Sequence, residues 1–169
     1  MRITLARAGA AVLAASAIAL AGAGGQAAAS AENVLGPDGF GPLKVGMSLA
    51  DAIATGKVGE PVGGNDLCRG YKWAYSSGPV LTISKAHGIY SIPGTAKGAH
   101  TPEGIGSGST ADAVKKAYPK AVDGWQNGTA IITTVTPQNP ANRYLFGIKE
   151  GKVTGFALQA VNARDCAAG

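Results

Sequence analysis

The sequence predicts an α+β fold in which two tandem helix-then-antiparallel-sheet modules share one core. The pattern S-x-A-D-A-[IV] occurs at residues 48–53 and again at 109–114, and short strand-like runs follow each copy. The copies are 61 residues apart, whereas the glycines that precede them, Gly46 and Gly108, are 62 apart. We interpret this as a diverged duplication; a coincidence between short alanine-rich segments is the alternative. Because a short helix cannot bury its apolar stripe alone, the sheet that follows each helix must cover it.

The first thirty-one residues have the pattern of a secretory signal peptide. Arg2 and Arg7 precede an apolar, alanine-rich run, and small residues precede the expected cleavage site. We place cleavage after Ala31, with Ala29 as the alternative. A retained membrane anchor is the competing interpretation, but the run is short for a spanning helix. We therefore expect the mature protein to be secreted, with no membrane insertion after the signal is cleaved.

The composition of the mature chain indicates a folded domain with a mild charge. Without residues 1–31 the chain has 138 residues, of which 13 are basic and 10 acidic, a net charge of +3. The nearest basic cluster, Lys115, Lys116 and Lys120, is interpreted as a solvated helix face and does not form the patch that nucleic-acid binding requires. Gly and Pro separate short apolar runs and do not form tracts, which indicates many turns.

Cys68 and Cys166 are the two cysteines of the chain. An even number of cysteines in an exported protein predicts a disulfide, here closing a loop of roughly 99 residues. In the chain-entropy model such a loop stabilises the fold by about 4–5 kcal/mol. A catalytic thiol is the alternative, but no activating histidine lies near either cysteine in the sequence.

The first module is expected at residues 43–93. Ser48 and Asp51 form a helix-start signature, and Gly56 is a plausible stop. Residues 57–70 are rich in Gly and Pro, so we expect them to form a loop. Three strands are then expected, over residues 71–75, 79–84 and 88–92.

The second module is expected at residues 105–169, after a linker over 94–104. A flexible lead over 32–42 precedes the first module. Ser109 and Asp112 repeat the helix-start signature, and Pro119 prevents the helix from continuing. Strand-like runs follow over residues 125–135, with the hairpin signal Asn127-Gly128 inside them, and over 143–148 and 152–161, which flank a second hairpin.

Two segments carry a resemblance to known families. PLKVGMSLADAIATG, residues 42–56, followed by a cysteine-containing loop, resembles the opening of β-lactamase inhibitory protein modules and of SmpA/OmlA-type outer-membrane assembly lipoproteins. With residues 102–119 and Cys166 added, the chain resembles small secreted proteins of unknown function from high-GC Gram-positive bacteria. The first resemblance implies a helical hairpin packed on an antiparallel sheet, and for the inhibitor a two-layer arrangement whose concave sheet face meets an enzyme. One cysteine in each half, where the inhibitor has a pair per module, implies a cross-link between modules.

The search for catalytic, metal and cofactor signatures yields weak signals. Residues 104–112, GIGSGSTAD, lack the lysine of a phosphate-binding loop and are interpreted as a helix cap after a flexible linker. The G-x-S-x-G elbow of serine hydrolases is missing from the sequence, and the His and Cys residues are too far apart for a zinc site. We expect no catalytic residue, metal or cofactor. The alternative function is a small secreted hydrolase with a site near His87 or His100.

Four aromatic residues form the candidate binding surface. Tyr71, Trp73 and Tyr75 alternate along an expected strand and therefore share one face. If exposed, they would form a rigid platform for a partner. If buried, they are core, which we favour because the chain has only ten aromatic residues. Trp125, beside the hairpin turn, is equally ambiguous.

These observations predict a secreted, monomeric, non-enzymatic binding module. We expect its ligand to be a protein or a component of the cell envelope, and we do not expect it to bind nucleic acid. A structural protein of the envelope with no discrete site is a further possibility. The two can be separated by asking whether an apolar patch is exposed.

Overall fold

The computed structural model describes residues 33–167, so the expected signal peptide, residues 1–31, lies outside the described part of the chain. Of the described residues, 50% are in strands and 12% in helices. The prediction of an α+β fold with two tandem helix-then-sheet modules is therefore wrong: the fold is mostly β. It consists of one eight-stranded antiparallel sheet and one two-stranded sheet.

The large sheet has the strand order β3-β4-β5-β6-β10-β9-β8-β7. Its members are β3 (Val58–Gly64), β4 (Cys68–Trp73), β5 (Ser76–Ser84), β6 (Gly88–Pro93), β7 (Val122–Gln126), β8 (Thr129–Val135), β9 (Asn142–Lys149) and β10 (Lys152–Ala160). The small sheet pairs β1 (Gly39–Phe40) with β2 (Leu43–Lys44). The last strand, β10, pairs with β6, with Leu158 opposite Ile92, and this pairing joins the two halves of the chain into one continuous sheet.

Three short helices accompany the sheet: α1 (Leu49–Ala54), α2 (Ala111–Ala117) and α3 (Arg164–Ala167). Ser48 begins α1, because its Oγ accepts a hydrogen bond of 3.1 Å from the Asp51 backbone N–H. The residue that caps α2 is Thr110, whose Oγ1 accepts from the Ala113 N–H at 3.1 Å. The expected start at Ser109 is therefore displaced by one residue, since the Ser109 hydroxyl instead accepts from the Gly106 N–H.

Two-residue turns connect β7 to β8 and β9 to β10. Asn127 and Gly128 have φ values of 49° and 75°, and Gln126 pairs with Thr129 across the turn, as expected from the Asn-Gly signal. The second turn has Glu150 at φ 51°, an unusual conformation for a residue with a side chain of this length. Both hairpins therefore have the right-handed twist of their strands built into the turn.

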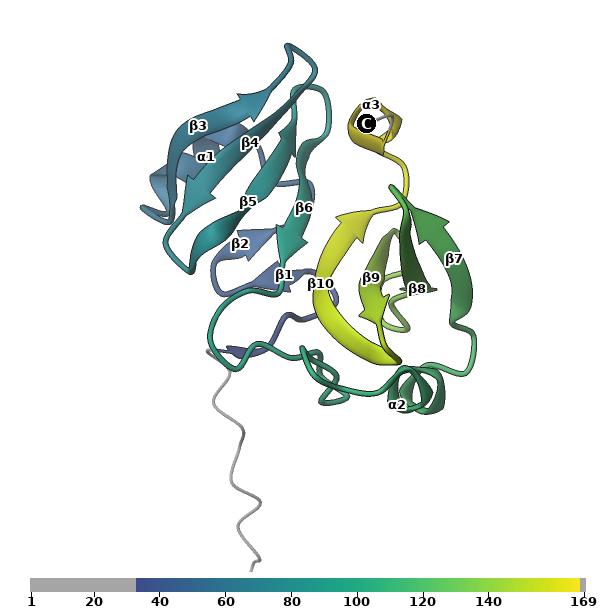
Figure 1. Ribbon diagram of the computed structural model, residues 1–169. Helices are drawn as coiled ribbons and strands as arrows, with labels where there is room; N and C mark the ends of the chain where they lie inside the picture. Colours follow the sequence, from purple (N-terminus) through teal and green to yellow (C-terminus); the bar gives the residue numbers. More distant parts are fainter. Residues whose placement is uncertain (1–32, 168–169) are drawn as a thin grey trace, which may run out of the picture.

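One face of the large sheet is covered. The N-terminal segment supplies Leu35, Phe40 and Leu43 to the core, and α1 and α2 supply Ala52 and Val114. The strands contribute the larger side chains of the same core: Trp73, Leu81, Ile83, Ile89, Ile92, Ile132, Tyr144, Phe146, Phe156 and Leu158. In Figure 1, α1 lies behind β3 to β5 and α2 lies below the strands β7 to β10, while α3 lies at the opposite end of the molecule.

Packing is tight where the two halves meet. Gly94 follows β6, and its N–H donates to the Phe156 carbonyl of β10 at 2.7 Å. A Cβ atom at Gly94 would lie 2.3 Å from the Phe156 ring, so only glycine allows this close approach. Residues 94–104, which the sequence suggests as a linker, also place Ala99 and Thr101 in buried positions.

Two buried tyrosines lie in the core beside α2. The Tyr118 hydroxyl donates a hydrogen bond to the Glu103 carboxylate, and the Tyr144 hydroxyl donates to the Leu35 carbonyl at 2.8 Å. Burial, followed by the hydrogen bond to Glu103, raises the pKa of Tyr118 well above its ordinary value. Burial also raises the pKa of Tyr144, with the Glu103 charge as a second cause.

Within residues 33–167, none of the helices has the length and apolar character that crossing a membrane requires.

Candidate functional site

The sheet face opposite the core is the candidate site. Strand residues alternate between faces, so Leu81 and Ile83 point to the core while Val80 and Thr82 point away from it. We call this second surface the open face. Its members are Val62, Gly70, Val80, Thr82, Ser91, Val122, Gly124, Ile131, Thr133, Val135, Arg143, Leu145, Gly147, Ala157 and Gln159.

The register of the strands aligns the open face into rows. The central row crosses six strands and consists, in order, of Gly70, Thr82, Ser91, Gln159, Arg143 and Val135. The next row contains Thr133, Leu145 and Ala157. Directly paired residues in a sheet lie about 4.5–5.5 Å apart, so neighbours within a row can act on one ligand. The central row therefore places hydroxyl, amide and guanidinium groups in one line, with aliphatic side chains beside them.

Arg143 is the charged residue of the central row. Its Nη2 donates to the Gln159 Oε1 at 3.3 Å, and its Nε is buried without a hydrogen-bond partner among the described residues. The two ion pairs found in the described chain, Arg69–Asp66 and Lys115–Asp123, do not include it. A half-buried guanidinium without an acidic partner retains most of its hydrogen-bonding capacity for a ligand.

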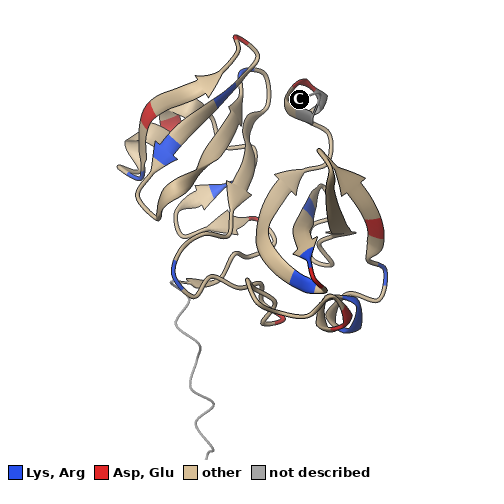
Figure 2. Cartoon of the chain, in the orientation of Figure 1, with Lys and Arg blue, Asp and Glu red and all other residues tan. Residues whose placement is uncertain are grey.

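Acidic residues are confined to the margins of the sheet. Strands β4, β5, β6, β8, β9 and β10 contain no Asp or Glu. Figure 2 shows the sheet's acidic segments on its two outer strands, which carry Glu60 in β3 and Asp123 in β7. Lys149 lies on the same face as Arg143, three alternations along β9, and is paired with Lys152. The inner strands of the open face therefore contribute no negative charge, and Arg143 contributes a positive one.

Helix α3 covers one end of the open face. The Cys68–Cys166 disulfide ties it to the start of β4, with a Cα–Cα distance of 5.3 Å, which confirms the predicted pair. The Ser84 hydroxyl of β5 also donates to the Asp165 Oδ2 at 2.5 Å. Between α3 and the strands lies a groove of about 620 Å³, with Val62, Val80 and Thr82 on its floor.

A second hollow, of about 560 Å³, lies beside the start of α1 on the covered side of the sheet. Ser48, Arg69 and His87 line it. The His87 ring makes no hydrogen bond to any described residue, and His87 is exposed. His100 lies elsewhere, and its Nδ1 contacts the Gly98 carbonyl at 2.9 Å. Neither histidine is therefore hydrogen-bonded to a Ser, Asp or Glu side chain of the described chain.

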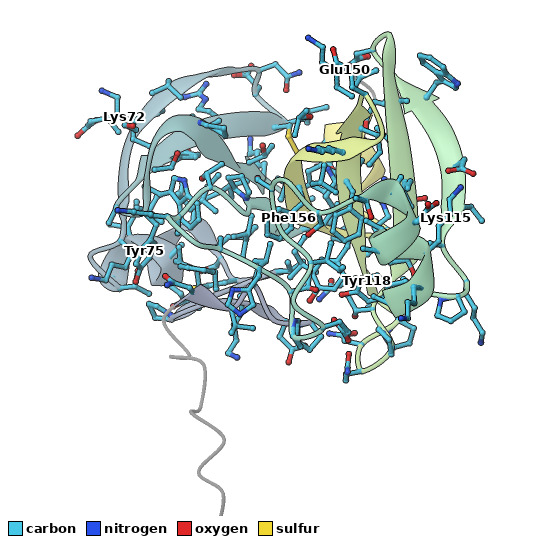
Figure 3. The ribbon with its side chains drawn as sticks, turned by 60° about the horizontal axis from the view of Figure 1, so that its bottom comes forward. Lys72, Tyr75, Lys115, Tyr118, Glu150 and Phe156 are labelled. Carbon is cyan, nitrogen blue, oxygen red and sulfur yellow. A yellow bond between two sulfur atoms is a disulfide. The ribbon has the colours of Figure 1, made fainter. Side chains whose placement is uncertain are left out.

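Three of the four aromatic candidates lie together on the core side of the sheet, as favoured from the sequence, and do not form an exposed binding surface. Trp73 is 5% exposed, and its indole N–H donates to the Pro79 carbonyl at 3.1 Å. Tyr71 and Tyr75 are half-buried and pack against the core, where Trp73 and Tyr75 form edge-to-face contacts with Phe40. Figure 3 shows Tyr75 in the half of the molecule that contains α1, with Phe156 nearer the middle. These three residues line the core side of β4 and the turn after it.

Trp125 lies at the other edge of the sheet. It is 78% exposed in β7 and is paired with Ala130, which places it on the face opposite Gly124 and Ile131. Trp125 therefore does not belong to the open face. The described residues also contain no group of three or more His, Cys, Asp or Glu side chains that could hold a metal ion.

The sequence analysis missed Arg143, Gln159, Ser91 and Thr82. A signal for Arg143 was available: in the run NRYLFGIK, the core residues Tyr144 and Phe146 alternate with Arg143 and Leu145. A single basic residue that points away from the core, on a strand without Asp or Glu, is a candidate for contact with a ligand. The alignment of Arg143 with Gln159 and Ser91 depends on which strands pair, and no local pattern shows this.

No protein-family model matches this chain, and neither curated proteins nor solved structures include one that resembles it significantly.

Proposed function

We propose that this chain is a secreted, non-enzymatic binding protein whose open face contacts a protein partner. One observation carries the proposal: helices and the N-terminal segment cover one side of an eight-stranded sheet. The other side carries aliphatic and hydroxyl side chains around Arg143, which has no acidic partner among the described residues. Interfaces between proteins typically combine an apolar centre with a few strong polar anchors, among which arginine is enriched.

The composition of the open face favours binding because little entropy is lost when a partner docks. Most side chains of this surface are short, such as Val, Thr, Ser and Ala, and lose little rotamer entropy on binding. They lie on paired strands, next to side chains of the neighbouring strands. Val62, Val122 and Val135 are exposed on it, at 46%, 60% and 47%. A broad, stiff surface of this kind fits a protein better than a small molecule, which binds in a concave cavity.

Secretion is supported by the disulfide and by the signal-like N-terminal sequence. A disulfide that joins distant parts of the chain is compatible with an oxidising compartment, where such bonds persist. The hydrolase alternative has weaker support, because His87 and His100 lack the hydrogen-bonded Ser or acidic partners that nucleophilic hydrolysis uses.

Site-specific cross-linking tests the proposal. A photoreactive amino acid is placed at Thr133, on the open face, or at Lys116, an exposed residue of α2 on the covered side. Each variant is exposed to the medium and envelope fraction of the producing cells and then irradiated. We expect a discrete protein adduct from Thr133 and none from Lys116.

An adduct of the same partner from Lys116 in equal yield would contradict the proposal, as would the absence of any adduct from Thr133. Thermal unfolding of both variants provides the control for folding. In addition, Thr133→Arg should abolish binding of the captured partner, because a bulky charged side chain would project from the row that also contains Leu145 and Ala157.

A further inference from the structure

The central row of the open face consists mainly of polar side chains and includes one arginine. Its polar members, Thr82, Ser91, Gln159 and Arg143, come from β5, β6, β10 and β9, which are consecutive in the sheet. Within the described chain, one hydrogen bond joins two of these side chains: the Arg143 guanidinium donates to the Gln159 side-chain oxygen. The hydroxyls of Thr82 and Ser91 have no hydrogen-bond partner among the described residues.

The charge distribution specifies the sign of the ligand. Arg143 has no acidic partner among the described residues, and the six strands that form the row contain no Asp or Glu. Asp165 of α3 lines the groove at the Thr82 end of the row; its Oδ2 accepts from the Ser84 hydroxyl, and its Oδ1 is buried without a hydrogen-bond partner among the described residues. At the β9–β10 end of the surface, Lys149 and Lys152 flank Glu150, so this end carries a net positive charge of one. Around Arg143, a negatively charged group complements this arrangement.

The surroundings of Arg143 make a carboxylate contact effective. The guanidinium is half-buried, and Gln159, which is 9% exposed, holds one of its nitrogens. Part of its side-chain entropy is therefore lost before any ligand arrives. The aliphatic side chains of Val135 and Leu145 lie beside it in the same and the next row. A partner that covers them would exclude water from the ion pair and strengthen it.

We propose that Arg143 binds an Asp or Glu carboxylate that a partner protein presents to the open face, with Gln159, Ser91 and Thr82 donating hydrogen bonds to the same segment. The inference rests on the proposed function, because it names the chemical group that the open face recognises. The planar guanidinium can engage both oxygens of a carboxylate, which a lysine at the same position could not do.

A displayed library of random peptides is the probe. The mature protein, with its disulfide intact, is immobilised, and bound peptides are enriched and sequenced. We expect the enriched peptides to share an Asp or Glu, and replacement of that acid by its amide to weaken binding by about tenfold or more. The variant Arg143→Gln should weaken binding to a similar extent, whereas Arg143→Lys should restore only part of it.

A double-mutant cycle makes the test specific. On Arg143→Gln, replacing the peptide's acid by its amide should cost nothing further, because the two groups contact one another. Arg69→Gln is the matched control: Arg69 is an exposed arginine of β4 whose partner in β5 is the core residue Ile83, which places it on the covered side. Its removal should leave binding unchanged. Thermal unfolding shows whether each variant folds.

The outcomes separate the two proposals. The carboxylate site is wrong if the enriched peptides fail to bind Thr133→Arg but carry no acid. It is also wrong if replacing the peptide's acid by its amide weakens binding to Arg143→Gln as much as it weakens binding to the wild type. In either case, binding by the open face stands. If the enriched peptides are insensitive to Thr133→Arg, they bind elsewhere, and the proposed function is wrong as well. A library that yields no enriched peptide would count against both.

Discussion

At the scale of single residues, the buried hydroxyls of Tyr118 and Tyr144 couple stability to alkaline pH. Both groups have a raised pKa in the folded protein, chiefly because burial disfavours the phenolate. The unfolded chain releases these protons near the ordinary tyrosine pKa of about 10. Folding is therefore stabilised fully below that pH, and the contribution is lost as the pH rises above it.

We expect the free energy of unfolding to fall above pH ~10, by at most about 1.4 kcal/mol per pH unit for each tyrosine. Tyr118→Phe should make this decline shallower. Urea unfolding between neutral and alkaline pH measures it, and absorbance at 295 nm follows phenolate formation, with the denatured protein as reference. An equal decline in wild type and Tyr118→Phe would show that Tyr118 does not contribute.

Arg143 shows where residue-level prediction stops. Its outward direction can be read from the alternation around Tyr144 and Phe146. Its neighbours Gln159 and Ser91 lie 16 and 52 positions away in the chain, and pairing between distant strands brings them together. The aromatic candidates illustrate the converse: Tyr71, Trp73 and Tyr75 share one side of the chain, and it is the core side, as the scarcity of aromatic residues favoured.

At the scale of elements, the hydroxyl that begins α2 is the feature most open to test. Thr110→Ala removes the acceptor for the Ala113 N–H and should destabilise the protein by about 1 kcal/mol. Thr110→Ser keeps the acceptor and should retain most of the stability. Ser107→Ala, at an exposed position before the helix, is the control. Urea unfolding provides the values; equal stability of Thr110→Ala and wild type would exclude a capping role.

The elements also show which local signals are reliable. The Asn127-Gly128 turn was predicted because both residues tolerate positive φ, and it forms at that position. Strand β3 was missed: Val58–Gly64 lies in the segment 57–70, which was expected to be a loop because of its Gly and Pro content. An edge strand tolerates proline, because one side of its backbone has no neighbouring strand. The Gly and Pro content of this segment therefore did not indicate a strand.

At the scale of the whole molecule, the disulfide joins α3 to a strand of the opposite half, 98 residues earlier in the chain. Reduction should lower the free energy of unfolding by up to about 4.7 kcal/mol, since the cross-link restricts the unfolded chain. Urea unfolding with and without reductant measures the loss. The double variant Cys68→Ser, Cys166→Ser should match the reduced wild type and be insensitive to reductant; a wild type whose midpoint is unaffected by reductant would contradict the prediction.

The fold class was predicted wrongly for a reason that belongs to this same scale. The sequence shows two stretches that each begin with a short helix and continue with strands, and the order of elements does not reveal what β6 and β10 pair with. Their pairing turns what would be separate sheets into one, and the helices, of six and seven residues, contribute little to the architecture. The alternation of residues within a strand does not indicate which distant strand it pairs with.

The position of β10 between β6 and β9 has a consequence for how the chain folds. Until residues 152–160 are available, β6 and β9 are both unprotected edges that can pair with other chains. When β10 docks, it therefore pairs with both β6 and β9. This step is slow because the contact with β6 joins residues far apart in the chain. The folding chain is most prone to aggregate in the interval before its last strand docks, so refolding yield should fall steeply with protein concentration.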